Sequence, residues 1–215
     1  MYLGAEAVSA AAWSSPRYSY LHNWISDLGS STQGAFQGRE INSPLYQVMN
    51  AGFLDQGLLL AMGLLLLTRH LPSRLRRTIA ALTIATTVGY ALLAFFHGSP
   101  QAAEDGTLAL HFLGAALAII GANTLAIVLG AHWWKHSYTR SLGHASLPLG
   151  IVGLVAVAVL FATMGSDLPA GLFERVSVYT AVLWVQLRIA LQLLLVDRPS
   201  TSPTPPARAA ALAHH

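Results

Sequence analysis

Histidines, carboxylates and one arginine are the side chains of this sequence that could carry acid–base chemistry. His97 and His111 ionise closest to neutral pH, so either could act as a general base, with Asp27 or Glu174 to orient it. Arg175 follows Glu174 directly, and a guanidinium binds phosphate or carboxylate groups well. Together these groups would suit catalysis on, or binding of, an anionic molecule. Each also has a structural explanation, because Asp27 suits a turn and Glu174 suits a helix N-terminus.

A second set of polar residues could supply hydrogen bonds to the same site. The predicted ligand-binding residues are Asn23, Ser26, Asn50, Arg175, Tyr179 and Gln186. The last three follow one another at i, i+4 and i+11, which places them on one stripe of a helix. Such a stripe could hold a lipid phosphate or carboxylate, and it could equally be a ladder of hydrogen bonds between helices.

No established catalytic signature joins these residues. The sequence has no His-Glu-x-x-His, no Gly-x-Ser-x-Gly, no glycine-rich phosphate loop and no paired aspartate-rich motif. It has no cysteine, which excludes disulfides, thiolate metal sites and a cysteine nucleophile. Two histidines and a carboxylate could bind zinc, but the spacing from His97 to His111 is weak support. We therefore predict no metal and no cofactor, and whether the protein is an enzyme stays open.

The elements that carry these residues are membrane helices. Of the 215 residues, 54% are apolar and only 10% are charged, which lies outside the range of soluble domains. Five apolar segments reach the roughly 20 residues that a helix needs to cross a bilayer. They are residues 45–67, 79–96, 108–133, 147–164 and 173–196. Residues 1–13 are apolar but too few, and suggest the outer half of a first helix that begins upstream, or a half-inserted helix. The fold predicted is all-α: a polytopic transmembrane bundle of six helices, the first truncated at its N-terminus.

Lysine and arginine residues predict the orientation of this bundle. Eight of the twelve lie in loops or the tail on one side: Arg69, Arg74, Arg76, Arg77, Lys135, Arg140, Arg198 and Arg208. Three, Arg17, Arg39 and Arg175, lie on the other side, and Arg188 falls within the last helix. The positive-inside rule therefore predicts a multi-pass cell-membrane protein with a cytoplasmic C-terminus and the candidate site on the non-cytoplasmic side. Since the net charge of +3 comes from these loops, we predict no nucleic-acid binding.

Residues 1–198 form the predicted transmembrane domain, and residues 199–215, rich in proline, serine and threonine at their start, form a disordered cytoplasmic tail. The longest loop, 14–43, has aromatic residues at 18–29 that predict a short interfacial helix ending at Gly29. Ser43 and Pro44 then suit the N-cap and first position of the next helix.

A stripe of small residues lies on the predicted helix 108–133. Gly114, Ala118 and Gly121 share the face of His111 and predict close helix packing or room for a ligand.

Three charged residues fall inside the predicted helices, where an uncompensated charge costs roughly a few kcal/mol. They are Glu6, Asp55 and Arg188. We predict an intramembrane ion pair of Asp55 with Arg188, because both would lie near the middle of the membrane. This pair would either lock two helices together or handle a proton or ligand, and Arg188 could instead extend toward the interface.

Four blocks of residues carry a resemblance to a known family. They are Asn23-Trp-Ile-Ser26-Asp27-Leu-Gly29, Met49-Asn50-Ala-Gly52-Phe, His111 at a helix start, and Gly171-Leu-Phe-Glu174-Arg175. In their order and spacing the chain resembles the bacterial and archaeal membrane family described as domain of unknown function 998, over residues 2–196. The resemblance implies six helices with a complete first helix, from which this sequence departs by starting late. It implies no reaction.

Two functions stay open. The first is binding or processing of a lipid or other amphiphile in a pocket on the non-cytoplasmic side, with membrane lipids and a small amphiphilic ligand as partners. The rival is a non-catalytic membrane protein, an accessory subunit or small-solute carrier, whose polar residues fasten helices. A carrier should show repeats or broken helices, and neither is evident. A pocket open to lipid would favour the first function, and a dry, fully paired interior would favour the second.

Overall fold

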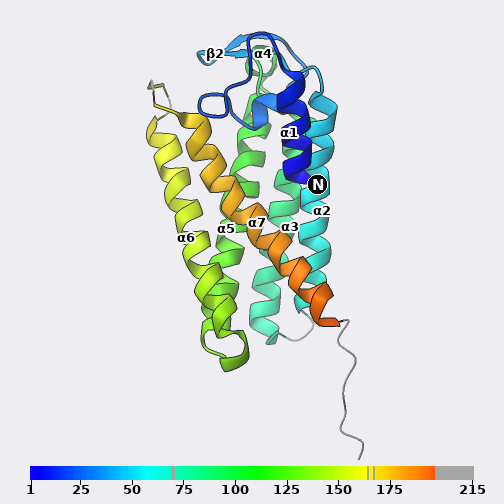
Figure 1. Cartoon of the computed structure of the whole chain (residues 1–215), viewed down its shortest axis with the longest axis vertical. Helices are drawn as coiled ribbons and strands as arrows, with labels where there is room; N and C mark the ends of the chain where they lie inside the picture. Colours follow the sequence, from blue (N-terminus) through cyan, green and yellow to red (C-terminus); the bar gives the residue numbers. More distant parts are fainter. Residues whose placement is uncertain (69–70, 164, 167, 197–215) are drawn as a thin grey trace, which may run out of the picture.

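The computed structural model is a helical bundle (Figure 1). It describes residues 1–68, 71–163, 165–166 and 168–196, with the backbone alone for Leu67 and residues 185–196. Five long helices form its body: α2 (Tyr46–Leu67), α3 (Ser73–Phe95), α5 (Leu108–Trp134), α6 (Arg140–Thr163) and α7 (Ala170–Val196). Shorter elements are α1 (Tyr2–Ala12), α4 (Pro100–Asp105) and the 3₁₀ turns η1 (Ser26–Gly29) and η3 (Ser137–Thr139).

Four of these helices, α2, α3, α5 and α6, are long and apolar enough to cross a membrane, judged on the described residues. The apolar segments singled out in the sequence are helical where the structure describes them, apart from single residues at their ends. A mostly helical bundle with four candidate membrane spans is thus confirmed, and the six crossings stay a prediction. Helix α3 begins before its predicted start and includes Arg74, Arg76 and Arg77 in its first turns. Helix α1 has 11 residues, and its start lies about halfway along the bundle (Figure 1). It is too short to span a bilayer.

Helix α5 lies in the centre and packs against α3, α6 and α7. Small residues bring these helices together. A Cβ on Gly114 would lie 2.7 Å from Leu92 Cβ, and one on Gly89 would lie 2.4 Å from the backbone nitrogen of Ala118. A Cβ on Gly121 would collide with Thr86. The glycines of the small-residue stripe therefore serve close packing of α5 on α3 rather than leaving room for a ligand.

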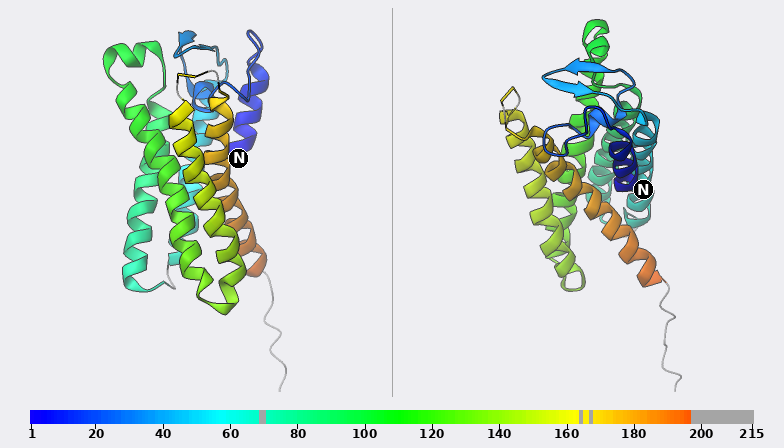
Figure 2. Two further views of the ribbon diagram at one scale, coloured as in Figure 1. Left: turned by 90° about the vertical axis from the view of Figure 1, so that its left-hand side faces the viewer. Right: turned by 45° about the horizontal axis from the view of Figure 1, so that its top comes forward.

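The outer end of the bundle, defined as the end that carries α4, is covered by a β-hairpin that the sequence patterns did not predict (Figure 2). Its strands are β1 (Gly34–Phe36) and β2 (Arg39–Ile41), which pair antiparallel with Gly34 opposite Ile41. The two turn residues, Gln37 and Gly38, both have positive φ, at 48° and 77°. This is the backbone of a tight two-residue hairpin turn.

Of two local predictions for the long loop, one holds in part and one is wrong. A short helix does end at Gly29, but it is a 3₁₀ turn that covers Ser26–Gly29, and residues 18–25 are not helical. The aromatic part is instead held by side chains, since the Tyr18 hydroxyl donates to the Trp24 carbonyl at 2.9 Å. Ser43 is not an N-cap either. Its hydroxyl donates to the Leu28 carbonyl at 2.6 Å, and α2 starts two residues later than predicted, after Leu45.

Candidate functional site

A buried ion pair joins the first and last helices at the outer end. Arg175 on α7 donates from Nε to Glu6 Oε1 on α1 at 3.0 Å, and the two side chains are 6% and 2% exposed. The Tyr179 hydroxyl donates to the other Glu6 oxygen at 2.7 Å. The charge of Glu6, which had no partner in the sequence analysis, is therefore compensated from one face of α7.

The rest of the Arg175 guanidinium is engaged by the long loop. Nη2 donates to the Tyr18 hydroxyl, and the guanidinium carbon lies 4.8 Å from the centre of the Tyr20 ring. Nη1 donates to the carbonyl oxygens of Tyr20, Asn23 and Gly171, at 2.6, 2.9 and 2.9 Å. Each of its three nitrogens thus has a partner within the protein. This arrangement fastens the loop to α7.

Glu174 fastens the same loop one residue further on. It is buried, and its Oε2 accepts the backbone N–H of Ile25. A Cβ on Gly171 would lie 2.3 Å from the Asn23 carbonyl oxygen, so the loop crosses α7 where a side chain would not fit. Two of the sequence blocks, around residues 23–29 and 171–175, are therefore in direct contact.

Asp27 forms a bidentate ion pair with Arg39 of the hairpin. Arg39 donates from Nε to Oδ2 at 2.9 Å and from Nη2 to Oδ1 at 3.2 Å. Asp27 Oδ2 also accepts the backbone N–H of Trp24 at 2.9 Å, and the guanidinium lies 4.2 Å above the centre of the Trp24 ring. Sequence reasoning counted Arg39 only as an outer-loop charge. An unpartnered arginine 12 residues after a buried aspartate was the signal that could have identified it.

His97 and Asn50 meet between α3 and α2. The Asn50 side-chain amide donates to the Gly29 carbonyl at 3.0 Å and lies 3.0 Å from His97 Nε2. Nε2 also lies 3.3 Å from the Ala94 carbonyl oxygen, and Nδ1 lies 3.3 Å from Ser31 Oγ, so both ring nitrogens have partners within the protein. Burial lowers the pKa of His97 below its usual value, which favours the neutral ring.

His111, on α5, has one ring nitrogen in a hydrogen bond and the other against backbone. Nδ1 lies 2.9 Å from the Phe96 carbonyl oxygen and therefore carries the proton. Nε2 faces Gly98, where a Cβ would lie 3.2 Å away. The side chain is only 3% exposed. This geometry holds the connection between α3 and α4 in place and leaves little room for a substrate at Nε2.

A cavity of about 830 Å³ opens at the outer end, beside these residues, and we call it the outer cavity. Its lining includes His22, Trp24, Gln37, Arg39, Phe112, Thr163, Ser166, Leu168 and Ala170. The hairpin and the long loop supply most of the polar groups, and the ends of α5, α6 and α7 supply the apolar ones. None of the four predicted catalytic residues is in this lining. Asp27 is one contact away, through Arg39.

A much smaller cavity of about 20 Å³ lies deeper in the bundle. Ser26 and Glu174 line it together with apolar residues of α2, α3, α5 and α7. The volume suits about one water molecule. These two predicted site residues are thus brought together, but in a space too small for a lipid or other organic ligand.

The predicted site residues therefore gather at one end without forming one pocket. Asn23 contacts Arg175 through its carbonyl, and its side chain donates weakly to the Glu40 carbonyl at 3.4 Å. The side chains of Gln186 and Arg188 lie outside the described residues, so the Asp55–Arg188 pair stays a prediction. Among the described residues, Asp55 Oδ2 and Gln56 Oε1 are buried without a hydrogen-bond partner. Within the same part of the chain, no three His, Asp or Glu side chains are placed to hold a metal ion.

Comparison with known proteins gives one match. A family model described as "Protein of unknown function (DUF998)" matches residues 3–189. No curated protein and no solved structure matches the chain. The matched range contains all four blocks of residues that carried the resemblance.

Proposed function

The chain belongs to the DUF998 family, whose description gives no activity. From the geometry of the outer cavity we propose that the protein binds an amphiphilic molecule without converting it chemically. The observation that carries this proposal is the two-sided lining of the cavity. The hairpin and the long loop supply Gln37, Arg39 and His22, and the side of the helix ends supplies Phe112, Leu168 and Ala170. Thr163 and Ser166 also lie on that side, but their hydroxyls donate to the carbonyls of Leu160 and Thr163. A molecule with a polar head and a hydrocarbon part complements both sides at once.

The polar side suits a head group rich in acceptor oxygens. Arg39 is held in place by Asp27 and by the Trp24 ring, so its guanidinium needs little reorganisation to donate a further hydrogen bond. Gln37 adds an amide and His22 an imidazole to the same lining. Because Asp27 already balances the charge of Arg39, hydrogen bonding rather than net attraction would select the head group.

The apolar side suits a hydrocarbon chain. Phe112 at the start of α5 and Leu168 before α7 line the cavity and are 37% and 56% exposed. Both lie at helix ends, where a chain held against them would continue toward the bilayer. In this proposal α7 is a further membrane crossing, the C-terminus is cytoplasmic, and the cavity faces the non-cytoplasmic leaflet.

Binding is favoured over catalysis by the state of the two candidate bases. His111 is covered, and His97 is hydrogen-bonded on both ring nitrogens, to Asn50 and Ser31. Neither lines the outer cavity. We assign His97, His111, Glu174 and Arg175 to positioning of the outer loops. The rival function, in which the polar residues only fasten helices, fits these four residues but leaves the two-sided cavity without a role.

The test is native mass spectrometry of the protein in mild detergent with single-chain phospholipids carrying a phosphate or a choline head group. Phe112→Ala should weaken retention about tenfold, the effect of removing one buried aromatic side chain. Gln37→Gly, which suits the positive φ, should reduce discrimination between the two head groups. Phe95→Ala is the matched control, because Phe95 is 68% exposed and outside this lining. Equal loss in Phe95→Ala and Phe112→Ala, or no retention by the wild type, would contradict the proposal.

A further inference from the structure

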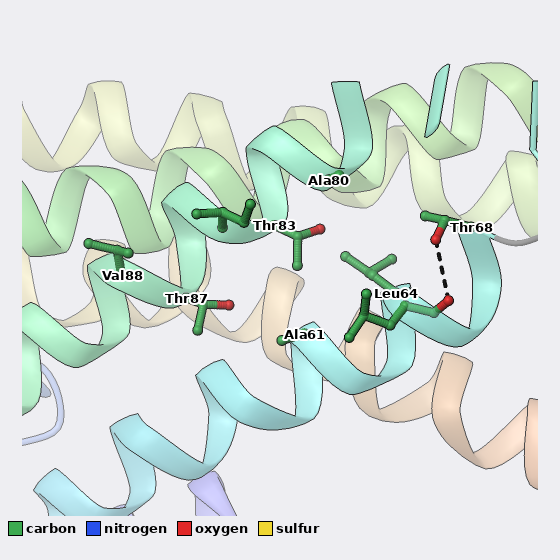
Figure 3. A pocket seen from close by; sticks show the side chains of 9 residues that line it. Ala61, Leu64, Thr68, Ala80, Thr83, Thr87 and Val88 are labelled. Atoms are coloured by element: carbon green, nitrogen blue, oxygen red, sulfur yellow. Dashed lines mark hydrogen bonds between the residues drawn. The ribbon is translucent and has the colours of Figure 1, made fainter. Parts of the chain in front are cut away.

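An apolar groove runs between α2 and α3 at the end of the bundle away from the hairpin (Figure 3). Its volume is about 250 Å³. Ala61, Leu64, Leu65 and Thr68 line it from α2, and Ala80, Thr83, Ile84, Thr87 and Val88 line it from α3. Figure 3 shows these side chains facing one another across the gap between the two helices. We call it the α2–α3 groove.

The groove lies next to a close contact between the two helices. At Gly57 a Cβ would lie 3.0 Å from Tyr90 Cβ, and Thr87 donates to the Gly57 carbonyl at 3.2 Å. One turn further along α2 the lining begins with Ala61, and Ala80 lines it from α3, so two of its walls are made by small side chains. The buried side chains of Leu64 and Thr83 form the floor.

The walls of the groove suit hydrocarbon. The Thr83 hydroxyl donates to the Ile79 carbonyl at 2.7 Å, and the Thr68 hydroxyl donates to the Leu65 carbonyl at 3.3 Å. These donors are used within their own helices, so they do not call for water in the groove. A space of this volume is also too small for another helix, which with side chains is roughly 10 Å across.

Two arginines stand at the open end of the groove. Arg76 and Arg77 lie four and three residues before Ala80, so they continue the groove face of α3 by one turn. Both are exposed. The ion pairs of the described chain are Asp27–Arg39 and Glu6–Arg175, so neither arginine has a carboxylate partner there. The sequence contains no acidic residue between Asp55 and Glu104.

We propose that the α2–α3 groove binds one acyl chain of an anionic phospholipid whose phosphate lies against Arg76 and Arg77. The apolar lining selects a hydrocarbon chain, and the unpaired guanidiniums at its mouth select a negative head group. This leaflet is opposite to the one that the outer cavity faces. The two sites are independent, and either could fail without the other.

The absence of cysteine allows a direct test. Met62→Cys, at a 54% exposed position beside the groove and outside its lining, carries a small fluorophore that reports on the groove without filling it. Val155→Cys is the control at a 58% exposed apolar position on α6. Nanodiscs contain phosphatidylcholine with an increasing fraction of phosphatidylglycerol brominated on its acyl chains. Quenching at position 62 should saturate at a lower fraction of the brominated lipid than quenching at position 155.

Two kinds of variant test the two parts of the proposal separately. Substitution of the arginines tests the contact with the head group, and larger side chains in the groove test the binding of the acyl chain. Arg76→Gln with Arg77→Gln should raise the half-saturating fraction at position 62, by about fivefold for each arginine. Arg74→Gln is the matched control, because residue 74 lies off the groove face. In native mass spectrometry Ala61→Phe should abolish retained phosphatidylglycerol, with Ala80→Phe as a second filling variant. The proposal would be overturned if quenching were equal at the two labelled positions, or if the two arginine substitutions left quenching unchanged. It would also be overturned if both filled variants retained as much phosphatidylglycerol as the wild type, or if filling the groove dissociated a dimer.

Discussion

Arg175 and Glu6 show what a single buried contact does in this protein. The pair lies where an isolated charge would be strongly disfavoured, and it is stabilised by a full set of hydrogen bonds from α1, α7 and the long loop. A buried pair of this kind is costly to break from one side, because the other charge is left without a partner. Arg175 therefore holds together α1, α7 and the long loop, which are far apart in the sequence.

Removing both partners should destabilise the protein less than the sum of the two single removals. We expect Glu6→Gln or Arg175→Gln to lower the free energy of unfolding by about 3–5 kcal/mol, and the double variant to lose less than the sum of the two. Thermal unfolding in detergent, analysed as a double-mutant cycle, measures the coupling. Glu104→Gln, at an exposed position of α4, should change stability by less than about 0.5 kcal/mol. Additive effects of Glu6 and Arg175 would contradict the assigned pair.

His97 should make stability depend on mildly acidic pH. Burial lowers its pKa, so the folded protein favours the neutral ring, and this contribution is complete above the unfolded pKa of about 6.5. It is lost as the pH falls from there through the lowered pKa. The melting temperature of the wild type should thus fall more steeply between about pH 7 and 5 than that of His97→Gln. Parallel curves for the two proteins would rule out this role for His97.

At the scale of elements, helices were predictable and the hairpin was not. Long apolar runs identify α2, α3, α5, α6 and α7 because a bilayer imposes length and hydropathy directly. Strands β1 and β2 have three residues each, too few to show an alternating pattern. Their register comes from the turn at Gln37-Gly38 and from the Asp27–Arg39 pair. The predicted helix over residues 18–29 failed because Tyr18 and Asp27 bind backbone groups that a helix would have used.

The hairpin turn offers a stabilising substitution. Gln37 has a φ of 48°, in the left-handed region that asparagine tolerates better than glutamine. Gln37→Asn creates the Asn-Gly sequence favoured at such turns, and should raise the free energy of unfolding by about 0.5–1 kcal/mol. Thermal unfolding without added amphiphile is the measurement. As a comparison, Gln37→Val should lower stability, and the opposite order would show that the turn is not formed in solution.

Glycine substitutions test the packing of α5 on α3. A Cβ on Gly89 would meet the backbone of Ala118 and Gly114 at 2.4 and 2.8 Å, and backbone cannot rotate away. Gly89→Ala should therefore destabilise by about 1–3 kcal/mol. Gly4, inside α1, has nothing within 4 Å of its would-be Cβ, so Gly4→Ala should stabilise by roughly 0.5–1 kcal/mol. Equal effects of the two changes, measured by thermal unfolding, would mean that α3 and α5 are further apart.

At the scale of the whole molecule, the sequence predicted which end would collect the polar residues but not how they pair. Alternation of helix direction brings residues 23–27, 97, 111 and 174–175 to one end, as expected. Glu6 and Arg175 were both noticed in the sequence. Their contact could not be predicted, because hydropathy indicates the level of a residue in the membrane but not which neighbouring helix its side chain faces. A pocket at this end was predicted, but its lining was not, because the hairpin that supplies Gln37 and Arg39 was not predicted.

Orientation in the membrane can be measured with single cysteines in this cysteine-free chain. The positive-inside rule predicts that Gln33→Cys, in the exposed part of the outer loop, reacts with a membrane-impermeant maleimide in intact cells. Tyr138→Cys, at a fully exposed position between α5 and α6, should react only after permeabilisation. Labelling at both positions in intact cells would point to mixed orientations, and the reverse pattern would place the outer cavity in the cytoplasm.

The ion pair between Glu6 and Arg175 can form only late in protein synthesis. The two residues are 169 positions apart, and at roughly 5–20 residues per second the ribosome needs about 10–30 s to supply the second after the first. During that interval Glu6 is present without the Arg175 guanidinium, and the carbonyl oxygens of Tyr20 and Asn23 in the long loop lack the donor on α7 that holds them. Attachment of the long loop and α1 to α7 is thus a late step of biogenesis, and Glu6 stays unpaired until Arg175 has been synthesised.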